Sequence, residues 1–175
     1  MDASIREATA YHEAGHCVVF TSELEDYPLD SISIVSDSIS SGRITDSQRH
    51  PKDWIQRARE GDTEVYKYCE GNICGCLAGE IAENAFSKSA NRQGASKDLE
   101  VADFFLAIRV PDHEKRPIHV RRLRERTERI VSEKWNWIVK LAEALLQSET
   151  LSREEVRALL AGMNEPQSRV FEASL

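Results

Sequence analysis

Residues 8–19 of the chain are ATAYHEAGHCVV, and this stretch decides how the rest of the molecule must be arranged. Side chains on one face recur every three to four residues, which predicts a helix over residues 5–20. Because the stretch is apolar almost all round, we expect the helix to be largely buried. Gly15 stands inside it, although glycine costs about 1 kcal/mol relative to alanine in a helix. The glycine therefore indicates that another element packs closely here.

His12, Glu13 and His16 form the pattern His-Glu-Ala-Gly-His within this helix. A helix advances about 100° per residue, so the two histidines lie one turn apart on one face and can bind one metal ion. Zinc in hydrolases is typically held by three protein ligands, with a water in the fourth position. Zinc makes that water acidic, and a carboxylate beside it accepts the proton as the water attacks a carbonyl. The pattern thus predicts a zinc site with Glu13 as general base.

The two histidines can also be ordinary helix residues without a metal. Both interrupt an apolar stripe, however, and a buried imidazole needs a polar partner, so the metal site is the better interpretation. The third ligand must come from elsewhere, and spacing alone does not choose among the carboxylates and imidazoles available. The candidates are Glu80, Glu83, Asp98, His50, His113 and His119. Glu80 and Glu83 are close together on a second predicted helix, and we expect them to support the histidines.

The second predicted helix runs from Thr63 to Phe86 and carries Gly71, Gly75 and Gly79 at four-residue spacing. Residues four apart share one face of a helix, so the glycines form a groove that another helix can approach closely. We expect that neighbour to be the helix with Gly15.

The remaining pattern predicts a mainly α fold, with a single helical zinc-peptidase domain over residues 1–161 and a small β-hairpin. Further helices are predicted over 54–61, 96–110, 118–147 and 152–160, and a return strand over 43–45. Residues 162–175 show little pattern, and we expect them to form a mobile tail. The first strand of the hairpin is expected to lie at an edge and to hold an extended peptide substrate by strand addition. Its residues are Ser31, Ile32, Ser33, Ile34 and Val35.

The composition of the 175-residue chain is that of a globular domain, with 41% hydrophobic and 30% charged residues. Its 23 basic and 30 acidic residues give a net charge of −7, which disfavours nucleic-acid binding. No apolar run approaches the roughly 20 residues that cross a bilayer, and residues 1–11 lack the layout of a signal peptide. We therefore expect a cytoplasmic protein with reduced, buried thiols. The cysteines are Cys17, Cys69, Cys74 and Cys76.

Four blocks of the chain, taken in order, resemble the peptidase domain of the FtsH-type, membrane-linked AAA proteases. The blocks are HEAGHCVV, CLAGEIAENAF, QGASKDLEVA and IVKLAEALLQSETLSREEVRALL, and they extend from about residue 8 to residue 160. The resemblance implies a zinc-dependent endopeptidase that cuts polypeptides. It also implies that Asp98 is the third zinc ligand, because the family's ligand is the Asp of a Gly-Ala-x-x-Asp-Leu block. Asp98 falls in the first turn of its predicted helix, where the helix dipole favours a carboxylate.

The chain also departs from that family. It contains no Gly-x-x-x-x-Gly-Lys-Ser/Thr phosphate loop and no membrane segment, and Glu80 stands where the family usually has arginine. Arg92 and Gln93 replace a threonine pair, and a short PDHEKRPIHV replaces a family segment. We therefore expect a stand-alone relative or an excised domain that cleaves flexible or unfolded polypeptides without its own ATPase.

Two other functions remain open. The first is a peptidase subunit that needs a separate ATPase or a docking protein. The second is a non-catalytic, zinc-containing module that binds peptides or proteins. Glu13 argues against the second, because a pure binding module needs no base at that position.

Residues 115–129 contain six arginines, which are a conceivable patch for nucleic acid. The alternative is a solvated helix face, on which the pairs Glu125–Arg129 and Arg124–Glu128 offset much of the charge. If the segment binds a partner, an acidic protein suits it better than a nucleic acid.

Overall fold

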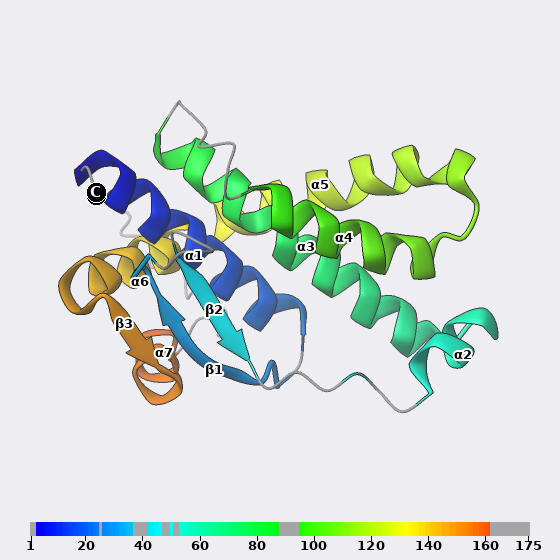
Figure 1. Ribbon diagram of the computed structural model, residues 1–175, viewed down its shortest axis with the longest axis horizontal. Coiled ribbons are helices and arrows are strands. Elements are labelled where there is room, and N and C mark those ends of the chain that lie inside the picture. The colour runs from blue at the N-terminus through cyan, green and yellow to red at the C-terminus, as the bar shows by residue number, and fades with distance from the viewer. Residues whose placement is uncertain are drawn as a thin grey trace, which may run out of the picture.

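The computed structural model of the chain describes residues 3–24, 26–36, 42–46, 50, 53–87 and 95–161. In these ranges helices dominate, and one small sheet lies against them (Figure 1). The helices are α1 (Ala3–Glu23), α2 (Trp54–Arg59), α3 (Thr63–Phe86), α4 (Ala95–Arg109), α5 (Arg116–Glu133), α6 (Trp135–Ser148) and α7 (Arg153–Leu159), with a 3-10 turn η1 (His113–Lys115). The strands are β1 (Leu29–Ser33), β2 (Arg43–Asp46) and β3 (Thr150–Ser152). The expected mainly α fold is confirmed. The predicted tail over 162–175 lies outside the described residues.

The pairing of α1 with α3 forms the centre of the molecule. α6 packs against α1, while α4 and α5 pack against α3 (Figure 1). The predicted close approach of the two central helices is confirmed. A β-carbon placed on Gly15 would lie 2.5 Å from Cβ of Ala82, and one on Gly75 would lie 2.2 Å from the Phe20 ring. The helices therefore approach to a distance that leaves no room for a side chain at these positions.

Local signals explain where several helices begin and end. The Asp62 side chain accepts hydrogen bonds from the backbone N–H groups of Glu64 and Val65, which fixes the start of α3. Ser152 and Glu155 form a reciprocal capping box at the start of α7. Pro111 follows shortly after α4 and prevents the helix from continuing.

The helix predicted over residues 118–147 is divided in the structure. α5 ends at Glu133 and α6 begins at Trp135, because Lys134 between them leaves the helical conformation, with φ −107° and ψ 18°. The break lets α5 pack mainly against α3 while α6 packs against α1. The apolar stripe of this region therefore serves two different neighbours. Its buried members include Leu123, Ile130, Ile138, Leu141 and Leu145.

The sheet is antiparallel, with the strand order β2-β1-β3. The hairpin of β1 and β2 is confirmed, but β3 was not expected, and it makes β1 the central strand. The expectation that residues 31–35 form an edge strand is therefore wrong. Backbone groups of 31–33 pair with β2 on one side and with β3 on the other, and the N–H of Ile34 bonds to the carbonyl of Glu149. Within the described residues, β2 is the outer strand and has a strand on one side only.

No helix in the described ranges has both the length and the apolar character needed to cross a membrane. The four cysteines are all free and buried, as expected.

Candidate metal centre

His12 and His16 on α1 meet Asp98 from the first turn of α4, the residue that the family resemblance implies as the third ligand. The two Nε2 atoms lie 3.0 Å apart, and each lies 3.2 Å from Oδ2 of Asp98. With zinc bonds of about 2.0–2.2 Å, the ligand atoms of a tetrahedral site are separated by about 3.3 Å. In the described part of the chain, these three side chains are the group with metal-binding atoms gathered at one point. The geometry therefore fits a zinc ion.

The other ring nitrogen of each histidine is already used. His12 donates from Nδ1 to Oε2 of Glu83 at 3.1 Å, and His16 donates from Nδ1 to the carbonyl oxygen of Gly75 at 2.7 Å. A carbonyl can only accept, so the proton of a neutral His16 ring resides on Nδ1, and the carboxylate of Glu83 selects the same tautomer for His12. Both Nε2 atoms then direct lone pairs at each other and at a carboxylate oxygen. Three electron-pair donors at this distance repel one another unless a positive charge lies between them.

The protonation behaviour of the cluster agrees with that requirement. Burial opposes a charge on His12, but the hydrogen bonds of Asp98 and Glu83 outweigh it and raise the pKa of His12 to about 10. Burial alone would raise the pKa of Asp98, yet the hydrogen bonds of His12 and His16 hold it below its ordinary value. The donor set thus favours a cation, and a divalent metal ion supplies one without a proton.

α3 supports the two histidines at regular four-residue steps. Gly75 provides the carbonyl for His16, and Glu83 provides the carboxylate for His12. Between them, a β-carbon on Gly79 would lie 2.3 Å from Nε2 of His16 and 2.7 Å from Nε2 of His12. Because α1 and α3 run antiparallel, the i, i+4 spacing on one helix matches the same spacing on the other. The sequence predicted Glu83 near the site and glycines at a helix interface, but not that the glycine face itself holds the histidines.

Glu13 lies beside the cluster and is 5% exposed. Burial raises its pKa, and the neighbouring His16 and His12 oppose the rise. A β-carbon placed on Gly42, just before β2, would lie 2.8 Å from Oε1 of Glu13 and 2.8 Å from Cγ2 of Thr9. No hydrogen bond joins the Glu13 carboxylate to another described residue, so both of its oxygens are available to a water or a substrate.

The remaining candidate ligands lie away from the cluster. Glu80 turns to the other side of α3 and pairs with Arg124 of α5 at 3.4 Å, so it does not support the histidines as expected. His50 bonds to the Tyr68 hydroxyl and stacks on Trp54. His113 lies in η1 and His119 in α5, and neither belongs to the cluster.

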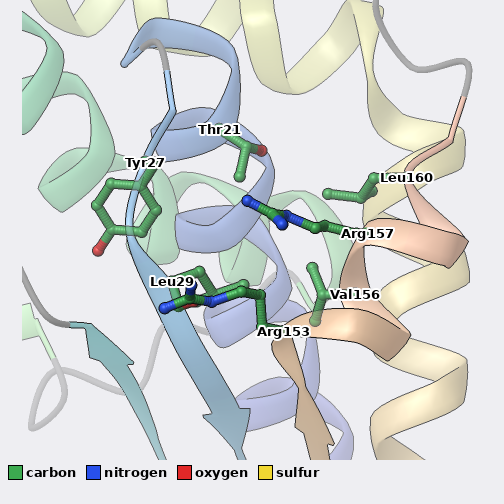
Figure 2. Close-up of a pocket in the computed structure, with 7 residues that line it drawn as sticks. All are labelled: Thr21, Tyr27, Leu29, Arg153, Val156, Arg157 and Leu160. Carbon is green, nitrogen blue, oxygen red and sulfur yellow. The ribbon is translucent and has the colours of Figure 1, made fainter.

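A separate pocket of about 190 Å³ lies between the end of α1, β1 and α7 (Figure 2). None of its residues belongs to the metal cluster, so this pocket is not where the predicted chemistry takes place. Its lining residues are Thr21, Tyr27, Leu29, Arg153, Val156, Arg157 and Leu160.

A known protein family and a known plant protein each match more than half of this chain. Residues 1–111 match the model of peptidase family M41. The ATP-dependent zinc metalloprotease FTSH 11, chloroplastic/mitochondrial, of Arabidopsis thaliana is 25% identical to the chain over 181 residues. The similarity covers 89% of this chain and 21% of the relative, so the chain spans about a fifth of the length of that curated protein.

Proposed function

The chain belongs to peptidase family M41, as the motif blocks predicted, and from this premise we propose that it is a zinc-dependent endopeptidase. The zinc ligands are His12, His16 and Asp98, and Glu13 is the general base. The observation that carries the proposal is the convergence of two Nε2 lone pairs and a carboxylate oxygen at 3.0–3.2 Å. Glu83 and the Gly75 carbonyl orient the two rings through Nδ1.

The reaction is hydrolysis of an amide bond. Zinc, when bound, supplies a Lewis acid that polarises the scissile carbonyl and lowers the pKa of water toward about 7. Glu13 accepts a proton from the attacking water while a C–O bond forms, and it passes that proton to the amine as the C–N bond breaks. Its burial favours the protonated form, so Glu13 is a better proton carrier than an exposed glutamate.

The substrate binds in extended form along β2, the outer strand of the described sheet. The start of this strand abuts Glu13 at Gly42, whereas β1 is paired on both sides. Strand addition uses backbone N–H and C=O groups, which a flexible chain offers and a folded domain does not. We therefore expect cleavage of flexible or unfolded polypeptides. The plant relative is named as an ATP-dependent protease. For this chain, a partner ATPase is a further proposal.

Glu13→Gln tests the catalytic role, since it keeps the size of the side chain and removes the proton acceptor. Hydrolysis of a casein-like flexible substrate should fall by at least about 100-fold, while zinc content and fold remain. Glu7→Gln is the matched control, because Glu7 is exposed on the same helix. Loss of zinc in Glu13→Gln would make Glu13 a ligand, and retained activity would transfer the role of base to another carboxylate. A wild-type protein that binds zinc and the substrate without cleaving it would favour the binding module.

A further inference from the structure

Tyr27 connects the C-terminal end of β2 to the body of the protein through a hydrogen bond, which is called the tie below. Its hydroxyl donates a hydrogen bond to Oδ2 of Asp46, the last residue of β2. Burial and this hydrogen bond raise the pKa of Tyr27, so the hydroxyl keeps its proton and acts as the donor. The tie therefore joins a buried side chain between α1 and β1 to the strand that lies at the edge of the sheet.

The tie sits where the strand register is irregular. Leu29 pairs with Asp46, but Ser31 pairs with Thr45, so Asp30 is an extra residue on β1. A bulge of this kind redirects side chains and bends the ladder, which leaves the position of the strand end to other contacts. Asp30 turns to Arg153 of α7, while Asp46 on the partner strand turns to Tyr27.

The Tyr27 ring is itself placed by the helices that build the metal centre. It stacks on Phe20 with a centroid distance of 4.7 Å and an interplanar angle of 4°. Phe20 fills the space over Gly75, whose carbonyl accepts the hydrogen bond of His16. Figure 2 shows the Tyr27 hydroxyl directed away from Arg157, and the ring borders the open pocket. The stacking on Phe20 and the hydroxyl bond thus fix the ring.

The opposite end of β2 lies against the proposed base. Gly42 abuts Glu13 and Thr9, and three residues separate it from Asp46. A strand of that length is short enough that holding one end restricts the other. The hydrogen bond at Asp46 therefore contributes to the position of β2 relative to Glu13.

We propose that the hydrogen bond from Tyr27 to Asp46 positions β2, the outer strand of the described sheet, so that a substrate peptide can bind along it beside Glu13. The inference rests on the proposed function. Tyr27 and Asp46 are positioning residues and do not touch the reacting atoms. Only molecules with β2 in place bind the peptide, so loosening the strand reduces apparent affinity by the fraction displaced. Bound peptide still reacts at the ordinary rate.

The test uses Tyr27→Phe, Asp46→Ala, the double variant and Asp46→Asn in the full chain. KM for a flexible fluorogenic peptide should rise by about fivefold in each of the first two variants, with kcat unchanged. The double variant should be no worse than Asp46→Ala, because the bond that Tyr27→Phe removes is already lost in that variant. Asp46→Asn keeps an acceptor oxygen and should stay near the wild-type KM. Thr150→Val is the matched control, since it removes a side-chain bond to Ser33 on the other side of β1.

Peptide affinity is measured separately in the Glu13→Gln background by fluorescence anisotropy, where no cleavage interferes. The dissociation constant should rise by the same factor as KM. A drop in kcat at constant KM, additive effects in the double variant, or an equal KM rise in Thr150→Val would overturn the inference. A wild-type protein that binds the peptide but never cleaves it would refute the proposed function, and the affinity series would still decide the role of Tyr27. Thermal unfolding of each variant establishes that it is folded at the assay temperature.

Discussion

α3 meets α1 and α5 with two faces of opposite character. Toward α1 it presents Gly71, Gly75 and Gly79, and the helices touch through backbone, rings and small side chains. Toward α4 and α5 it presents Glu70, which lies 2.9 Å from Arg109, 3.0 Å from Arg122 and 3.6 Å from Arg126. The first contact is held by shape and the second by charge.

The difference teaches where precision is needed. Contact by shape tolerates almost no added atoms, since interiors are close-packed, and it leaves His12 and His16 no room to shift toward α3. Contact by charge at the surface depends weakly on geometry and is screened by salt. The arginine-rich segment is also explained in part by this second face. Arg122, Arg124 and Arg126 form ion pairs with glutamates of α1 and α3. Much of the positive charge of the arginine-rich segment is therefore balanced within the protein.

The largest effect should come from removing the metal, which binds only where the shape-held face gathers its ligands. At a free zinc concentration of a thousand times Kd, binding stabilises the folded chain by about 4 kcal/mol. Chelation should therefore lower the melting temperature by about 10 °C. Calorimetry with and without a chelator measures the shift. His16→Ala should neither hold zinc nor respond to the chelator, and stoichiometric zinc in that variant would refute the ligand assignment.

Gly79→Ala should disrupt the shape-held face where it meets the two histidines. The new methyl group would lie 2.3 Å from Nε2 of His16, so the rings must move. We expect zinc affinity to fall by about tenfold to 100-fold, as for other changes that displace metal ligands. Competition with a chromophoric chelator measures it. Gly71→Ala is the control, because its methyl group would meet Leu24 and the carbonyl oxygen of Glu23 and neither of the two histidines. Equal zinc affinity in the two variants would contradict the assignment of Gly79.

Glu70→Gln should weaken the charge-held face by a smaller amount. The side chain is 12% exposed and faces three arginines of α4 and α5. We expect a loss of about 1 kcal/mol in the free energy of unfolding at low ionic strength, shrinking as salt is added. Urea titrations at low and high salt measure it. Glu64→Gln on the same helix, which removes an exposed pair with Lys67, serves as control. A loss that does not change with salt would mean that Glu70 acts through packing.

Arg124→Gln should have the smallest effect. Arg124 is 39% exposed and reaches Glu80 at 3.4 Å and Glu128 at 3.3 Å. Exposed pairs contribute little, so the free energy of unfolding should change by less than about 0.5 kcal/mol, and zinc affinity should not change. A clear fall in zinc affinity would show that the two faces of α3 are coupled and would weaken the distinction between them.

The sequence predicts the shape-held face well because glycine spacing has one physical meaning. Gly71, Gly75 and Gly79 at helical spacing, with Gly15 opposite, predict a close helix pair. Spacing alone could not select Asp98 over Glu80 or Glu83. The selection depends on where α4 lies relative to α1 in the fold, and spacing along the chain does not give that position. The family resemblance made that choice, and the structure brings Asp98 to the histidines.

Two features escaped the sequence for different reasons. Lys134 breaks the last long helix without a proline or glycine to mark the place, because α5 and α6 pack on different neighbours. β3 contains three residues, too few to show alternation, and it turned the expected edge strand into the central one. Short strands are specified by their partners, and their own residues carry little of the signal.

The four-residue steps of α3 also make its length indispensable. The carbonyl of Gly75 and the carboxylate of Glu83 hold His16 and His12 from positions eight residues apart. Inserting or deleting one residue between them would leave a continuous helix but rotate one support by about 100° relative to the other. The number of residues from 75 to 83 is therefore as important to the metal centre as the identity of the glycines in this segment.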